Sequence, residues 1–146
     1  MKFKKPADIS QYLKENKWFF IGLAGLTFLV YANILDNAFV SDDIAGILNN
    51  PERGKILRSL KKCNFNALSK DFIFLIFGKS KAAYHFFSIV FHIISSVLIF
   101  FFVAVFTKRE NLSKYTAVIF ALHPVHTEAV AWISATHYLM YPSFFI

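Results

Sequence analysis

Residues 82–107 form an apolar run that contains no Asp, Glu, Lys or Arg. At about 1.5 Å per residue, a helix of that length can cross the roughly 30 Å of hydrocarbon in a bilayer with some tilt. Residues 18–35 form a second uncharged apolar run. The chain is 56% hydrophobic and only 17% charged, and its apolar residues are clustered rather than spread at amphipathic spacing. The sequence therefore predicts membrane spans rather than a globular core.

The polar segments between these runs predict how the chain is threaded through the membrane. A basic N-terminal tail before an apolar run resembles a signal peptide, but this run is too long and no small-residue cleavage site follows it. We expect an uncleaved anchor with a cytoplasmic N-terminus, although the many basic residues after the first span mean that the positive-inside rule does not settle the orientation. The expected order, in one N-terminal membrane region, is a cytoplasmic tail (1–17), a span (18–35), an extracytoplasmic loop (36–81), a span (82–107), a cytoplasmic loop (108–114) and a broken helix or further span (115–146).

The last of these segments contains Pro124, which lacks an N–H group and breaks or kinks a helix. Broken helices at membrane depth line cavities, because lipid cannot satisfy their freed backbone groups. The expected fold is thus an all-α integral membrane protein with about three to four transmembrane or broken helices. Amphipathic interfacial helices are expected in the first extracytoplasmic loop. The apolar end at residues 141–146 looks like a truncated part of a longer protein.

The formal net charge of +7 points to lipid phosphates rather than nucleic acid, because the basic residues lie in the gaps between apolar runs. These side chains could hold the first loop against lipid headgroups or grip a diphosphate. Cys63 is the only cysteine, so no internal disulfide or multi-cysteine metal site is expected.

Asp42 and Asp43 follow the first span directly, and adjacent carboxylates are costly next to hydrocarbon but stable at the water interface. One of them can act as a general base on a hydroxyl while its neighbour orients it or binds a cation. The structural alternative is an Asx turn or a helix N-cap before residues 44–48.

A second polar cluster is formed by His123, His126 and Glu128 within a nearly apolar stretch. These groups are expensive in lipid unless they face a cavity. Their spacing is not that of the His-Glu-x-x-His zinc helix, so no metal site is predicted. The alternative is a kinked span with internally satisfied polar groups. His85 and His92 lie on one helix face, where they can contact the loop above or pack inside the bundle.

Several strings of this sequence together resemble a known family. The chain is similar to the transmembrane and tetratricopeptide-repeat O-mannosyltransferases and their bacterial relatives, which belong to the GT-C class of polytopic glycosyltransferases. The similarity extends from about residue 18 to residue 134. It is carried by Asn37-Ala38-Phe39-Val40-Ser41-Asp42-Asp43, Asn49-Asn50-Pro51, Phe77-Gly78, Tyr84-His85 with His92, and above all Ala121-Leu122-His123-Pro124-Val125-His126-Thr127-Glu128-Ala129-Val130-Ala131-Trp132-Ile133-Ser134.

The resemblance implies transfer of a sugar from a polyprenyl-phosphate donor to a hydroxyl of an acceptor protein, outside the cytoplasm. It implies that Asp42 and Asp43 are the catalytic pair, with Asp42 as the base. It also implies that His123, His126, Glu128 and His85 bind substrate. No cofactor is required by this resemblance, and a divalent metal stays open.

The sequence also departs from the family pattern. Asn66 stands where the family often has an Arg in the first loop, and an amide cannot replace that charge. The family's further spans and repeats do not follow, so this chain is expected to be inactive alone. A bacterial inner membrane and an endoplasmic reticulum membrane both fit. The alternatives are a non-enzymatic membrane subunit or scaffold, and a fragment of a transporter.

Overall fold

A computed structural model describes residues 13–140 and contains only helical elements and their connections in that range. The expected tail at residues 1–12 and the apolar end at residues 141–146 lie outside the described residues. The all-helical prediction is confirmed for the part described. In chain order the elements are α2 (Lys17–Tyr31), η1 (Ala32–Asp36), η2 (Ile44–Leu48), α3 (Ile56–Lys61), α4 (Phe65–Phe77), α5 (Lys81–Thr107), α6 (Glu110–Leu122), η3 (Pro124–His126), α7 (Thr127–Ala131), η4 (Ile133–Thr136) and α8 (His137–Met140).

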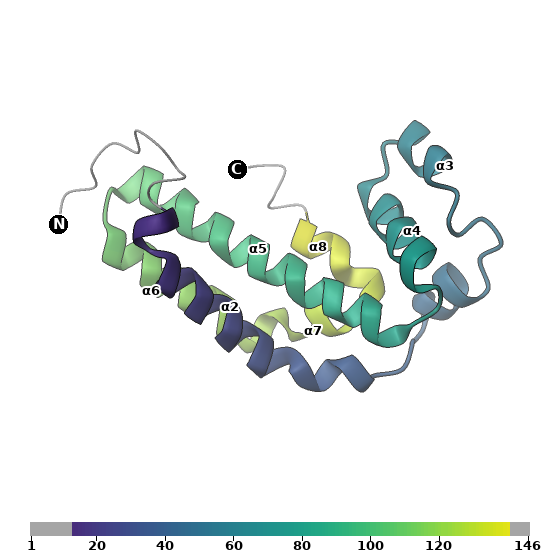
Figure 1. The fold of residues 1–146 in the computed structure, drawn as a ribbon, viewed down its shortest axis with the longest axis horizontal. Coiled ribbons are helices and arrows are strands. Elements are labelled where there is room, and N and C mark those ends of the chain that lie inside the picture. The colour runs from purple at the N-terminus through teal and green to yellow at the C-terminus, as the bar shows by residue number, and fades with distance from the viewer. Residues whose placement is uncertain (1–12, 141–146) are drawn as a thin grey trace.

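Three helices, α2, α5 and α6, run side by side along the long axis of the molecule (Figure 1). Two helical stretches, Lys17–Asp36 and Lys81–Thr107, are long and apolar enough to cross a membrane by length and composition. They match the two runs predicted from the sequence. Because α5 runs antiparallel to both neighbours, the end of η1 lies near the start of α5, whereas the end of α6 lies beside the middle of α5, where Ala121 contacts His92.

The helices approach closely because small residues line the contact between α5 and α6. Ser113, Ala117 and Ala121 of α6 recur every four residues and are fully buried. Ser96 and Ala104 of α5 are buried as well, and Leu23 of α2 and Phe100 of α5 complete an apolar cluster with the alanines. Small side chains at such contacts are typical of helices that associate in a membrane, where close backbone approach replaces the hydrophobic effect.

The segment between α2 and α5 folds as a corner that projects from the bundle, with α3 and α4 packed against each other (Figure 1). Ile47, Ile73 and Tyr84 form a buried cluster with Ile133 of η4, which attaches this corner to α5 and to the last elements. The loop contains two helices, α3 and α4, and the large apolar side chains of Leu57 and Phe72 are exposed on them. Their position at a membrane interface stays a prediction.

A buried ion pair fixes the corner internally. Arg53 Nη1 lies 3.0 Å from Asp71 Oδ1, and both side chains are nearly inaccessible. Asp71 also accepts hydrogen bonds from Gly54 N at 3.1 Å and from Ser59 Oγ at 2.5 Å. Gly54 has φ of +90°, a left-handed conformation that glycine adopts without a Cβ clash, whereas a Cβ there would meet Phe74 at 3.2 Å.

The third apolar segment is broken at Pro124. Helix α6 ends at Leu122, and His123 has an extended backbone (φ −69°, ψ 129°) as expected for a residue before proline. The chain then continues through η3, α7, η4 and α8 as short turns that pack back against α5. Helix α6 begins at Glu110, so residues 110–114, which were predicted to be loop, are helical.

Candidate functional site

A hydrogen bond joins the acidic pair, Asp42 and Asp43, to η4 near the end of the chain. Ser134 Oγ donates to Asp43 Oδ1 at 2.5 Å, across 91 positions of sequence. The backbone N–H of Val40 donates to Asp43 Oδ2 at 3.4 Å. Asp43 stands at the N-cap position of η2, yet its side chain makes no capping bond to that helix. The capping alternative therefore does not describe Asp43, whose carboxylate instead joins two distant segments.

The two neighbouring aspartates have opposite environments. Asp43 is completely buried, whereas Asp42 is exposed. Both oxygens of Asp43 already accept hydrogen bonds from the protein, so this carboxylate is engaged in holding the site together. The carboxylate of Asp42 is accessible to a molecule arriving from outside.

Lys70 of α4 brings a positive charge to the acidic pair. Its side chain is 9% exposed, and both Asp43 and Asp42 act on its ammonium group. Burial lowers the pKa of Lys70 to about 8, and the nearby Arg53 guanidinium contributes to the lowering while the two aspartates oppose it. Lys70 consequently carries its proton near neutral pH and can balance the negative charge of the pair.

His85 of α5 lies buried beneath the same region, with 1% of its surface exposed. Its ring lies alongside the Asn37 backbone, and the Asp43 carboxylate is close enough to act on it. Neither ring nitrogen makes a hydrogen bond of good geometry to any of the residues 13–140. The structure thus places His85 near Asp43, on the buried side of the acidic pair.

His123 and His126 belong to a different cluster, around His92 of α5. The ring centroid of His126 lies 5.2 Å from that of His92 and 4.2 Å from that of Phe120. His92 Nε2 is 3.0 Å from the carbonyl oxygen of Ala121, so His92 is part of the helix packing. His123 Nδ1 accepts a hydrogen bond from Val125 N at 3.2 Å, which supports the turn at the proline.

Glu128 does not belong to the cluster of His123 and His126. It lies at the end of the bundle that carries Asp42 and Asp43, which is called the acidic end. It lines a groove of about 470 Å³, bounded by Asn37, Ala38 and Val40 on one side and by Thr127, Glu128, Ala131 and Trp132 on the other. The groove lies near Asp43, because Val40 of one wall donates to that carboxylate and Ser134, its other donor, follows Trp132 of the other wall by two residues. Of the four predicted substrate-binding residues, Glu128 is the one that lines this groove.

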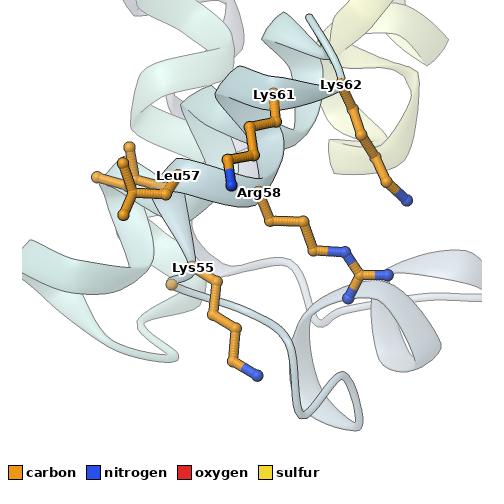
Figure 2. Close-up of a pocket in the computed structure, with 7 residues that line it drawn as sticks. Lys55, Leu57, Arg58, Lys61 and Lys62 are labelled. Atoms are coloured by element: carbon orange, nitrogen blue, oxygen red, sulfur yellow. The ribbon is translucent and has the colours of Figure 1, made fainter.

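A second cavity of about 710 Å³ lies along α3 and is lined by Gly54, Lys55, Ile56, Leu57, Arg58, Lys61 and Lys62. Figure 2 shows Leu57 extending to the opposite side of α3 from the Arg58 guanidinium and the Lys62 ammonium. Lys55 and Arg58 are paired with the exposed Glu52 carboxylate, and these pairs lower the pKa of Glu52. This amphipathic surface carries the basic side chains that the sequence assigned to lipid phosphates.

Within residues 13–140, no three His, Cys, Asp or Glu side chains are grouped closely enough to hold a metal ion. What the acidic end offers is a buried, hydrogen-bonded aspartate, an exposed aspartate beside it, a buried lysine and a groove with a glutamate at its rim. This arrangement can remove a proton from a hydroxyl group and hold a polar substrate nearby.

Comparison with known proteins shows several similar relatives. The chain is 30% identical over 137 residues to the protein O-mannosyl-transferase TMTC1 of Homo sapiens, a match that covers 76% of this chain and 15% of the relative. It is 31% identical to TMTC1 of Mus musculus, covering 76% of the chain and 14% of the relative, and 25% identical to TMTC3 of Homo sapiens, covering 85% and 16%. This chain is homologous to the TMTC protein O-mannosyl-transferases.

The homology to the TMTC proteins agrees with the resemblance seen in the sequence. The chain spans only about 15% of the length of these TMTC relatives, so their complete activity is not carried over by the match. No family model matches the chain. No solved structure matches it either.

Three residues at the acidic end were not singled out from the sequence: Ser134, Trp132 and Lys70. Ser134 and Trp132 lie in the string that carries the TMTC resemblance, which was the available signal for them. Lys70 was counted among the basic loop residues. Its burial depends on the packing of α4 against the acidic pair, for which local sequence contains no signal.

Proposed function

We propose that this chain forms part of a polytopic glycosyltransferase that moves a mannosyl group from a polyprenyl-phosphate donor to a hydroxyl of an acceptor protein. The reaction takes place on the extracytoplasmic side. The transmembrane topology is multi-pass, with the Asp42–Asp43 end of the bundle facing away from the cytoplasm. The activity belongs to the complete polypeptide, since the TMTC relatives are much longer than this chain.

The observation that carries the proposal is the hydrogen bond between Ser134 and Asp43. It joins the acidic pair to the segment with the most specific sequence resemblance. Homology to proteins named protein O-mannosyl-transferases then favours sugar transfer over other reactions that a carboxylate can assist.

In the proposed step, Asp42 accepts the proton of a Ser or Thr hydroxyl on the acceptor. The hydroxyl oxygen attacks the anomeric carbon, and the bond from that carbon to the phosphate oxygen breaks. The polyprenyl phosphate leaves with the bonding electrons. Asp43 positions the loop that carries Asp42, and the positive charge of Lys70 balances the negative charge of the pair.

The test is transfer of radiolabelled mannose from a polyprenyl phosphomannose to an acceptor peptide by the complete gene product in membranes. Asp42→Asn should lower the rate by about 100-fold or more, because a positioned general base typically contributes about 10²–10⁴. Asp36→Asn is the matched control, since Asp36 is another exposed carboxylate a few positions earlier. It should retain transfer.

Unchanged transfer by Asp42→Asn at normal expression would overturn the assignment of the base. Absence of transfer by the unmodified protein would favour a scaffold. Movement of a solute across sealed vesicles without any glycosylated product would favour a transporter.

A further inference from the structure

Trp132 occupies a distinctive position in the groove of about 470 Å³ beside Asp43. It follows α7 and lies two residues before Ser134, which donates to Asp43. The opposite wall contains Val40, whose backbone N–H also donates to Asp43. The groove therefore adjoins the proposed reaction centre through Val40, and its volume falls within the roughly 300–1,000 Å³ of small-molecule sites.

The accessible part of the Trp132 side chain is its aromatic carbon surface. The residue is half-buried, but its Nε1 atom is fully buried and has no hydrogen-bond partner among residues 13–140. The indole therefore offers the groove no hydrogen-bond donor, and carbon atoms are the part of its ring that a ligand can reach. The face of an aromatic ring carries partial negative charge, so it attracts polarised C–H bonds.

Polar groups surround this aromatic surface. Asn37, Thr127 and Glu128 line the same groove and are exposed. A purely hydrocarbon occupant such as an isoprenoid chain would cover these groups without satisfying their hydrogen bonds, which is costly. A pyranose ring fits better, because it has an apolar C–H face and hydroxyl groups at its edge.

We propose that Trp132 is the stacking platform for the hexosyl group of the donor, with Glu128 and Asn37 accepting and donating hydrogen bonds at the sugar hydroxyls. This inference rests on the proposed sugar transfer, and it assigns the sugar to the groove beside Asp43. Trp132 is a binding residue in this scheme and takes no part in proton transfer.

The chain contains only two tryptophans, which allows a direct test. Trp18 lies in the first turn of α2 and is 74% exposed, at the opposite end of that helix from Asn37. In the 146-residue chain held in nanodiscs, Trp18→Phe leaves Trp132 as the sole tryptophan. Titration with citronellyl phosphomannose should change its emission in a saturable way, and citronellyl phosphate without the sugar should not.

Retention of radiolabelled citronellyl phosphomannose on the same nanodiscs measures binding independently of fluorescence. Trp132→Leu should weaken retention about fivefold, the size expected for loss of one aromatic contact, whereas Trp132→Phe keeps a ring and should bind nearly as well as the parent. In Trp132→Phe the remaining Trp18 should show no response to the donor.

Three outcomes would overturn the inference. Donor retention with unchanged Trp132 emission would remove the stacking role and leave the proposed function standing. An equal response to citronellyl phosphate would mean that the groove takes the lipid or phosphate rather than the sugar. No retention of the donor, by the 146-residue chain and by the complete gene product alike, would overturn the inference, and the mannose-transfer test would then decide the proposed function separately.

Discussion

At the residue scale, the acidic end shows how two identical side chains in adjacent positions acquire different roles. Asp43 is buried and accepts hydrogen bonds from Ser134 and Val40, whereas Asp42 is exposed. A buried carboxylate needs compensation, and the Lys70 ammonium acts on it. The carboxylate that is open to solvent and the carboxylate that fixes the loop are thus neighbours in the sequence.

Lys70 gives a pH prediction at the same scale. Its pKa is about 8 in the folded chain and 10.5 ordinarily, so between these values the unfolded state binds the proton that the folded state has lost. Stability therefore rises with pH through this window, and below pH 8 the cost of burying the charged lysine is fully present. Between pH 7 and pH 10 the free energy of unfolding of the protein should rise by about 2–3 kcal/mol more than that of Lys70→Met.

Thermal unfolding of both proteins in detergent across this pH range gives two stability curves. Their difference reports Lys70 alone, because the other lysines and the tyrosines titrate equally in both proteins. The groups that act on Lys70 are Arg53, Asp43 and Asp42, and all three are retained in the variant. Parallel stability curves for the two proteins would contradict the burial of a charged Lys70.

At the scale of elements, the corner of α3 and α4 depends on the Arg53–Asp71 pair. Removing one partner leaves an uncompensated buried charge, and Arg53 also donates through Nε to the Gly46 carbonyl oxygen at 2.9 Å. Arg53→Met should therefore destabilise the protein by about 3–5 kcal/mol. Lys55→Met is the matched control, since it breaks an exposed pair with Glu52 and should cost far less.

Thermal unfolding followed by circular dichroism compares the two variants, and proteolysis of the corner gives a local readout. Simultaneous replacement of Arg53 and Asp71 by apolar residues should recover part of the loss, because no unpaired charge remains. Equal losses for Arg53→Met and Lys55→Met would show that the buried pair contributes no more than a surface contact.

At the scale of the whole molecule, the features that sequence predicts are those governed by local composition. The charge-free runs predict α2 and α5 because only an apolar helix of that length satisfies its backbone in lipid, and Pro124 predicts the break because its missing N–H is a local property. The separation of Glu128 from His123 and His126 was not predicted. It arises from the turns of η3 and α7, which direct successive polar side chains to different neighbours.

The orientation of the bundle is the remaining molecular-scale prediction, and Cys63 is a natural probe for it. Cys63 is exposed in the corner between α3 and α4, on the side that we propose to be extracytoplasmic. In sealed right-side-out vesicles, a membrane-impermeant maleimide should label Cys63 without permeabilisation. In a Cys63→Ser background, Arg109→Cys lies past the other end of α5 and should be labelled only after permeabilisation.

The positive-inside rule does not predict this result, because the proposed extracytoplasmic loop itself carries eight basic residues between positions 53 and 81. The reverse labelling pattern would place the acidic pair in the cytoplasm, and labelling of both positions from one side would mean that α5 does not cross the membrane.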